Sequence, residues 1–121
     1  MLSRLTTTPV LVAAALTLGF WLAAAPTAAA QDAAAAKKGQ EVYNAQKCSI
    51  CHAIAGKGGK ANPLDGVGAK LSAEDIRQWI VSPAEATAKA KSTKKPPMPA
   101  KYGSLPAGDL DALVAYMQSL K

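Results

Sequence analysis

Apolar positions along the chain recur mainly at the spacing of α-helices. The clearest stripe predicts a helix over residues 106–120, with apolar side chains at the i, i+3, i+4 and i+7 positions of one face. These positions are Leu110, Leu113, Val114 and Met117. A first helix is predicted over residues 33–47, where Gly39 and Tyr43 share a face. Glycine costs a helix interior about 1 kcal/mol relative to alanine, so Gly39 predicts that another helix passes close to its backbone.

Two further helices are predicted in the middle of the chain. Ser72 can cap the N–H of Asp75 and so begin a helix. The inward stripe of this helix is Ile76, Trp79 and Ile80. Pro83 cannot continue it but suits the first position of a second, shorter helix, for which Ser82 and Glu85 form a capping pair.

Two segments carry the residues of loops. Residues 56–66 are rich in glycine and contain the turn-forming pair Asn62-Pro63. The short helix is expected to end near Lys91, and residues 94–99 then read Lys-Lys-Pro-Pro-Met-Pro, which excludes a helix and favours a stiff extended loop. Little of the chain has the alternating pattern of a β-strand, so the sequence predicts an all-α fold.

Residues 1–30 have the pattern of a secretory signal peptide. Arg4 is their only charged residue, residues 10–25 are nearly all apolar or small, and the alanines at 28–30 suit a signal peptidase. The alternative is a retained membrane anchor, but the apolar run is shorter than the ~20 residues that a spanning helix needs. We therefore expect cleavage after residue 30 and export to the periplasm, with residues 31–121 as the folded domain.

The composition leaves this domain short of material for a hydrophobic core. Half of the full chain is apolar (50%), but much of that is alanine. The aromatic residues after position 30 are Tyr43, Trp79, Tyr102 and Tyr116. The two cysteines allow at most one disulfide. Small domains with so little core usually need a metal or a cofactor, so we expect a large apolar group to complete the interior.

The candidate chemistry is concentrated in the run Cys48-Ser49-Ile50-Cys51-His52. A C-x-x-C-H run is typical of c-type haem attachment. Residues three and four apart share a face of a helical turn, so Cys48, Cys51 and His52 are expected to project together. The two thiols can then bond to the two vinyl groups of a haem while the imidazole ligates its iron. His52 is the only histidine in the chain.

Other uses of these residues explain less of the sequence. A structural zinc site needs four ligands, usually Cys or His, and the chain has only three such residues. A thioredoxin-like dithiol requires a βαβ context, for which strands are missing. A plain disulfide is common in exported proteins, but it leaves the adjacent histidine and the small core unexplained.

The iron would need a second axial ligand, and methionine is the remaining candidate. Met98 lies between prolines, which restrict the backbone beforehand and so reduce the entropy lost on binding. The alternatives are that Met98 only packs on the haem edge, or that Met117 is the ligand. Met117 lies on the inward stripe of the last helix, where methionine is more often core filler. We therefore expect His52 and Met98 as axial ligands, a pair that raises the reduction potential and leaves no open position for oxygen or peroxide.

Taken in order, these elements resemble the small single-haem class I cytochromes c. The resemblance covers residues 39 to 120. It rests on Gly39-x3-Tyr43, the run from Cys48 to His52, Asn62-Pro63-Leu64, Trp79-Ile80-x-x-Pro83, Met98-Pro99 followed by Tyr102, and Leu113-Val114-Ala115-Tyr116-Met117. It implies four to five short helices wrapped around one covalently bound haem c, with the first and last helices crossing.

The resemblance also implies supporting roles in the haem pocket. Pro63 matches a proline whose carbonyl accepts the hydrogen bond of the ligand histidine, which fixes the His52 tautomer. Trp79 is expected near a haem propionate or wall, with an ordinary core aromatic as the alternative. Tyr102 matches the aromatic residue that follows the ligand methionine. The chain departs from the common pattern at Asn62, where many relatives have glycine.

The function implied by the resemblance is electron transfer, with the haem iron cycling between ferric and ferrous states. We expect no enzymatic reaction and no small-molecule substrate. The alternative is a haem c subunit of a larger redox enzyme complex, such as a sulfur-compound dehydrogenase or a terminal oxidase. Contact with a membrane is expected only if the leader is retained.

The lysines suggest the kind of partner. The chain has a net charge of +6, and lysines gather on both sides of the proposed ligands. They are Lys47, Lys57, Lys60, Lys89, Lys91, Lys94 and Lys95. They form either a docking surface for acidic redox partners or a merely solubilising surface. Nucleic acid is not expected, because the basic stretches lack interleaved aromatic residues for stacking.

Overall fold

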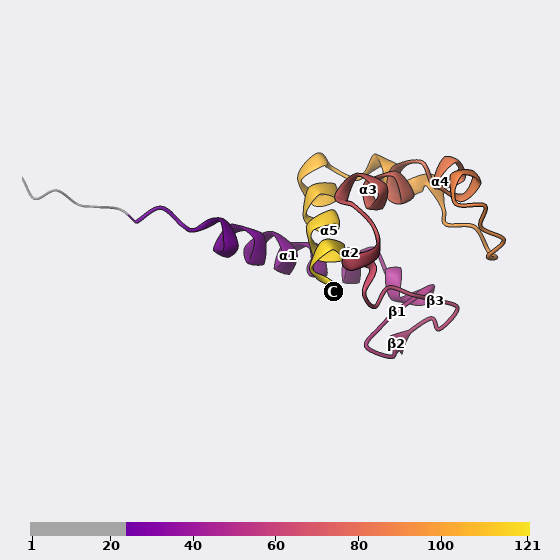
Figure 1. Ribbon diagram of the computed structural model, residues 1–121, viewed down its shortest axis with the longest axis horizontal. Helices are drawn as coiled ribbons and strands as arrows, with labels where there is room; N and C mark the ends of the chain where they lie inside the picture. The colour runs from indigo at the N-terminus through magenta and orange to yellow at the C-terminus, as the bar shows by residue number, and fades with distance from the viewer. Residues whose placement is uncertain (1–23) are drawn as a thin grey trace, which may run out of the picture.

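The computed structural model describes residues 24–121. Its elements, in chain order, are α1 (Ala28–Ala45), the 3₁₀ turn η1 (Cys48–Ile50), β1 (His52–Ile54), β2 (Lys57–Gly58), β3 (Asn62–Pro63), α2 (Val67–Lys70), α3 (Ala73–Val81), α4 (Pro83–Lys89), η2 (Ala100–Ser104) and α5 (Ala107–Ser119). Helices dominate the described part (Figure 1), in agreement with the predicted helical class. None of the helices in this part has the length and apolarity needed to cross a membrane. Most of the expected signal peptide lies outside the described residues.

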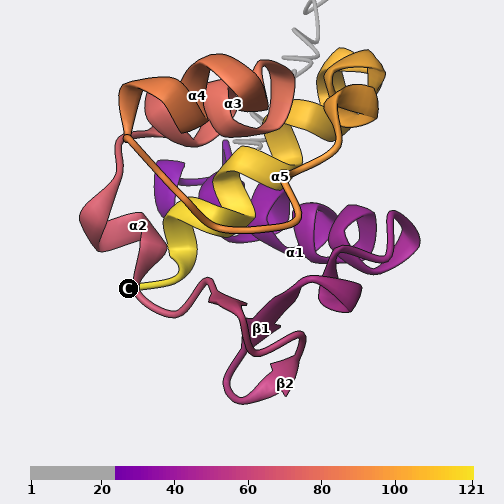
Figure 2. The ribbon, with the colours of Figure 1, turned by 90° about the vertical axis from the view of Figure 1, so that its right-hand side faces the viewer.

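The crossing of α1 and α5 organises the fold (Figure 2). The two helices meet at Gly39, where a Cβ atom would lie 2.6 Å from the Cβ of Tyr116 and closer still to the carbonyl oxygen of Ala112. The helix that Gly39 predicts beside its backbone is therefore present. Tyr43, one turn further along α1, packs edge-to-face against Tyr116, with ring centroids 5.8 Å apart.

The hydrophobic core is formed by side chains of α1, α3 and α5. Its buried members are Val42, Tyr43, Ile76, Ile80, Leu110, Leu113, Val114 and Met117. The apolar stripes predicted for α3 and α5 both contribute to this core. The exception is Trp79, which is half-buried and lies outside the cluster. Within residues 24–121, no large side chain is completely buried. The interior made by the polypeptide is therefore thin, as the composition predicts.

The first helix begins earlier and ends earlier than predicted. The side chain of Thr27 accepts a hydrogen bond from the N–H of Ala30 (3.3 Å), and the alanines that follow have the highest helix propensity. The helix therefore begins at Ala28. It ends at Ala45, because Lys47 has a left-handed backbone with φ of 56°.

The caps of the two middle helices differ. Ser72 caps α3 as predicted, since its hydroxyl accepts from the N–H of Asp75 (3.1 Å) and donates to the Asp75 carboxylate (2.8 Å). The predicted cap of α4 by Ser82 is wrong, because the Ser82 side chain makes no capping hydrogen bond. Ser82 is also the C-cap of the preceding helix, where its N–H donates to the carbonyl of Gln78. That double role gives its backbone a conformation that does not suit an N-cap.

The structure contains a small sheet that the sequence does not predict; two of its strands lie in the predicted loop of residues 56–66. Strand β1 pairs antiparallel with β2 and parallel with β3, in the order β2-β1-β3. The sheet is braced by Asp65, whose carboxylate accepts a hydrogen bond from the N–H of Ala55 (2.8 Å). Ala55 needs this support because its backbone is left-handed, with φ of 51°. Strands of two or three residues are too short to show an alternating pattern, which is why the sequence does not reveal them.

Replacing Gly39 with alanine is expected to destabilise the protein. The new methyl group must push α5 away, and overpacking of this kind costs about 1–3 kcal/mol, more than the gain of about 1 kcal/mol in helix propensity. Gly108→Ala in α5 is the matched control, because its Cβ would meet only the Lys38 ammonium, at 3.7 Å. Guanidinium denaturation followed by circular dichroism measures both; equal effects on the free energy of unfolding would contradict the close crossing.

Replacing Ser72 with alanine is expected to raise the pKa of Asp75. Hydrogen bonding from Ser72, followed by the Lys89 ammonium, holds the pKa of this carboxyl below its usual value. A lowered carboxyl pKa stabilises the folded state above the ordinary pKa of aspartate, and this stabilisation is lost as the pH falls. NMR titration of the Asp75 carboxyl measures the shift. Lys89→Ala should also raise the pKa, and an unchanged pKa in Ser72→Ala would contradict this assignment of causes.

Candidate functional site

The two cysteines of the C-x-x-C-H run lie on a single tight turn. The N–H of Cys51 donates to the carbonyl of Cys48 (3.2 Å), and the residues from Cys48 to Ile50 form the 3₁₀ turn η1. Residues i and i+3 eclipse one another in such a turn, which brings the two cysteines to the same side. The prediction of one continuous helical turn is wrong for His52, which instead begins strand β1.

The two thiols have different surroundings. Both are free, so the plain disulfide is not formed. Cys48 is half-buried and packs against the core cluster, whereas Cys51 is exposed. Burial raises the pKa of the Cys48 thiol and the nearby Cys51 adds to this effect, while a hydrogen bond with the backbone and the positive charge of Lys101 oppose it. Lys101 belongs to η2, the segment that follows Met98.

The ring of His52 is oriented by a backbone carbonyl. Its Nδ1 lies 3.0 Å from the carbonyl oxygen of Asn62. A carbonyl oxygen can only accept a hydrogen bond, so Nδ1 carries the proton and donates, which leaves the Nε2 lone pair available for a metal. The parallel pairing of β1 with β3 places Asn62 opposite His52 and Pro63 opposite Ala53.

This arrangement corrects the role predicted for Pro63. The carbonyl that accepts from His52 belongs to Asn62, one residue earlier. Pro63 is exposed and stands opposite Ala53 in the ladder. The sequence marks the segment through its proline, but the strand register decides which carbonyl faces the imidazole.

The backbone of His52 is held by a second group that the sequence analysis did not single out for this role. The hydroxyl of Tyr43 donates to the His52 carbonyl oxygen (3.0 Å). Tyr43 is buried (5% exposed), and burial, followed by the nearby Cys48 and Tyr116, raises its pKa to about 12. A buried tyrosine hydroxyl usually has a hydrogen-bond partner, so a tyrosine on the inward face of the first helix was the available signal.

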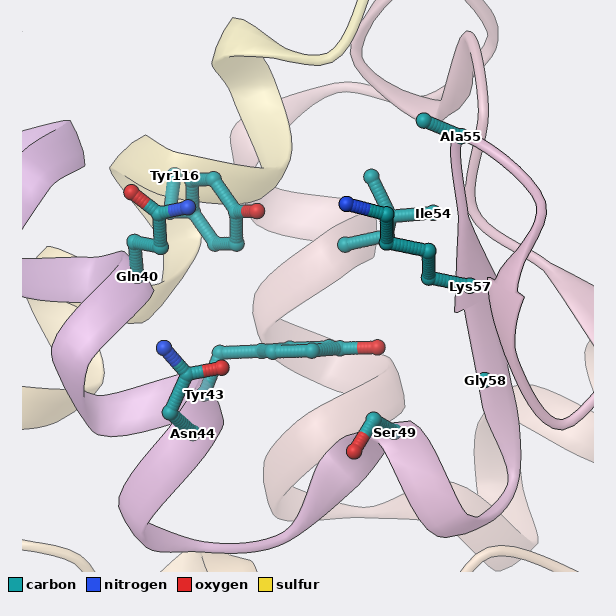
Figure 3. Close-up of a pocket in the computed structure, with 9 residues that line it drawn as sticks. All are labelled: Gln40, Tyr43, Asn44, Ser49, Ile54, Ala55, Lys57, Gly58 and Tyr116. Atoms are coloured by element: carbon teal, nitrogen blue, oxygen red, sulfur yellow. The ribbon is translucent and has the colours of Figure 1, made fainter.

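An open pocket of about 420 Å³ lies above Tyr43 (Figure 3). It is lined by side chains of α1 and the β1–β2 hairpin, together with Ser49 and Tyr116, and the Tyr43 ring forms one of its walls. Cys48, Cys51, His52 and Met98 do not line it. The pocket therefore adjoins the C-x-x-C-H turn through Tyr43, Ser49 and Gly58 without being lined by the candidate ligands.

Met98 and Met117 have different environments, as predicted. Met98 is half-buried between exposed prolines and packs against the core cluster from outside. Met117 is 5% exposed and is a member of that cluster. Tyr102 also packs against the cluster, and its ring lies 5.1 Å below the Lys101 ammonium. The fold thus brings Met98 and Tyr102 against the same core as Cys48, although Cys48 is distant from them in sequence.

Trp79 lies outside the core cluster. It lines a smaller pocket of about 210 Å³ between α3 and α4, together with Leu71 and Ala86. Asp75 and Lys89, which also line this pocket, form an ion pair of 3.0 Å. The structure places Ile76 and Ile80 in the core but leaves Trp79 half-exposed, so the inward stripe is narrower than predicted.

The available donors do not suit a conventional protein metal site. Among residues 24–121, no three His, Cys, Asp or Glu side chains gather closely enough to hold a metal ion. The zinc alternative therefore has no support in the described part of the chain. Two free thiols on one turn, followed by a histidine whose Nε2 is available, are instead the residues of a c-type haem attachment run.

Comparison with known proteins identifies one family. The model of the cytochrome c family, described as "Cytochrome c", matches residues 36–121. The match begins on α1 before Gly39 and includes the C-x-x-C-H turn, Met98 and all of α5. Searches of curated proteins and of solved structures found no match.

Replacing Tyr43 with phenylalanine is expected to lower the free energy of unfolding of the holoprotein by about 1 kcal/mol, because the His52 carbonyl loses its donor. Tyr116→Phe is the control, since the Tyr116 hydroxyl makes no hydrogen bond to residues 24–121. Guanidinium unfolding of both variants measures the difference. Equal stabilities of the two variants would show that the Tyr43 hydroxyl does not support His52.

Proposed function

Because the chain belongs to the cytochrome c family, we propose that it carries single electrons between redox partner proteins. Members of this family bind haem c covalently, so the chain holds one haem and takes part in haem-based electron transfer. The observation that carries the proposal is the packing of Cys48, on the C-x-x-C-H turn, and of Met98 against the same core cluster.

The residues of this turn fit a covalently attached haem. Cys48 and Cys51 are free thiols on one turn, and each can form a thioether with one vinyl group. His52 would ligate the iron through Nε2, because Asn62 engages Nδ1. The macrocycle would also supply apolar surface to a core in which no large side chain between residues 24 and 121 is completely buried.

Met98 is the proposed second ligand. Its half-buried position on the outside of the core cluster leaves it able to reach a group seated there, whereas Met117 is enclosed within the cluster. A histidine–methionine pair raises the reduction potential, because the neutral soft sulfur favours ferrous iron. With both axial positions filled, the site suits electron transfer rather than oxygen or peroxide chemistry. Tyr102 and Trp79 would border the group from the sides of η2 and α3.

Charge is unevenly divided along the chain. Residues 42–64, which include the C-x-x-C-H turn, contain three lysines and no Asp or Glu. Residues 86–108, which include Met98, contain five lysines and no Asp or Glu. All eight acidic residues of the chain therefore lie outside these two segments.

The two lysine-rich segments meet in the fold. The Lys94 ammonium donates to the carbonyl of Ala61 (3.1 Å), and the charge of Lys101 acts on the Cys48 thiol. These contacts support a basic region around the proposed ligands, to which Lys94 and Lys101 contribute. Such a region speeds encounter with acidic partners and loses its effect as salt rises. We take partners with acidic docking surfaces as the electron donors and acceptors.

The leader pattern of residues 1–30 supports a periplasmic location for this carrier. A haem subunit of a larger redox complex would use the same ligands and the same fold. The two functions differ in whether the protein leaves native cells alone or bound to a larger subunit during purification.

Replacing Met98 with alanine is expected to abolish the weak near-infrared absorption of the ferric holoprotein, which arises from sulfur–iron charge transfer. It should also lower the midpoint potential, because a neutral sulfur ligand is lost. Met117→Ala is the matched control: it should keep the band while costing about 2–5 kcal/mol of stability, as expected for a methionine in a core. Absorption spectra and potentiometric titration measure both. Loss of the band only in Met117→Ala would move the ligand to Met117.

A further inference from the structure

Two consecutive backbone carbonyls hold the two segments that carry the proposed ligands. The Asn62 carbonyl accepts from Nδ1 of His52 (3.0 Å), and the Ala61 carbonyl accepts from the ammonium of Lys94 (3.1 Å). Lys94 belongs to the segment that carries Met98. Figure 2 shows this segment crossing in front of α5 on its way from α4 to η2.

We propose that Lys94 is a positioning residue that ties the Met98 segment to the support of His52. In this arrangement, residues 61–62 form a common anchor for both axial ligands. The inference rests on the proposed ligation by Met98. It identifies a residue that is not itself a ligand but controls how firmly the Met98 thioether is held in position for the iron.

The segment that carries Met98 has few other hydrogen bonds to the rest of the protein. Between Thr93 and Met98, the bond from the Lys94 ammonium is the only hydrogen bond to a distant part of residues 24–121. On the far side of Met98, η2 is seated tightly on α3, since a Cβ atom on Gly103 would lie 2.9 Å from the Val81 carbonyl oxygen. Apart from the packing of the Met98 side chain on the core cluster, the segment is thus held at one end by η2 and at the other by Lys94.

Proline makes this single attachment effective. Residues 96, 97 and 99 are prolines, each with a fixed φ. A restrained backbone loses little entropy when it is fixed at one point, so holding Lys94 also restricts the position of Met98. In a flexible segment, the same hydrogen bond would restrict only its immediate neighbours.

Lys95 provides a matched control. It adjoins Lys94, carries the same charge and is exposed, but its side chain makes no hydrogen bond or ion pair within the described residues. Lys94→Ala and Lys95→Ala therefore remove the same charge from the same surface, and only the first removes the tie to Ala61. Lys94→Arg keeps both the charge and the donors.

The experiment measures carbon monoxide binding to the ferrous holoprotein by stopped flow, since carbon monoxide must wait for the thioether to leave the iron. Lys94→Ala is expected to bind about fivefold faster than the wild type, the factor that corresponds to one lost hydrogen bond. Lys95→Ala should match the wild type, and Lys94→Arg should restore most of the slow rate. Equal rates in Lys94→Ala and Lys95→Ala would overturn the proposal.

A second measurement separates this inference from the ligand assignment. The NMR order parameters of the Thr93 and Met98 amides should fall in Lys94→Ala and stay unchanged in Lys95→Ala, whatever ligates the iron. If wild type and Met98→Ala bind carbon monoxide equally fast, the ligand assignment fails, and so does the proposed control of a ligand by Lys94. Unchanged order parameters in Lys94→Ala would reject the tie to Ala61 itself.

Discussion

The hydrogen bond between His52 and the Asn62 carbonyl is the contact on which the candidate site depends. Because the carbonyl can only accept, this one contact decides which ring nitrogen bears the proton and which is free for iron. The contact exists because two very short strands lie in parallel register, and because Tyr43 holds the first residue of β1 while Asp65 holds Ala55, the residue that follows the strand. A histidine on a turn without these contacts would have nothing to fix the orientation of its ring before the iron binds.

The interior of the molecule explains why a domain this small has so specific an architecture. Two helices approach closely at Gly39, and the side chains around their crossing form most of the core, yet no large side chain in residues 24–121 is completely buried. The family to which the chain belongs binds haem c covalently. Covalent attachment makes the cofactor part of the hydrophobic interior, which relieves the polypeptide of supplying that surface itself.

Much of the helical framework could be predicted from residues alone, because helices have long periodic signals. The stripe of α5, the cap at Ser72 and the close packing at Gly39 all follow from local chemistry. The C-x-x-C-H run and the contrast between Met98 and Met117 were also readable from the sequence.

The remaining details depend on tertiary register, which single residues do not encode. The strands are too short for a pattern, so the acceptor for His52 was assigned to Pro63 instead of Asn62. Ser82 has the chemistry of a cap but ends the preceding helix, and Trp79 sits at helical spacing yet remains at the edge of the core.

The proposed basic region around Cys48 and Met98 would give the molecule an electric dipole, because the carboxylates lie in other segments of the chain. In the electric field of a charged protein or electrode, a molecule with such a dipole rotates into alignment before it makes contact with that surface. On a negatively charged conductor, it would adsorb by the surface around Cys48 and Met98. The haem attachment site and the path of electron transfer would then both face the conductor, and no linker would be needed to orient the protein.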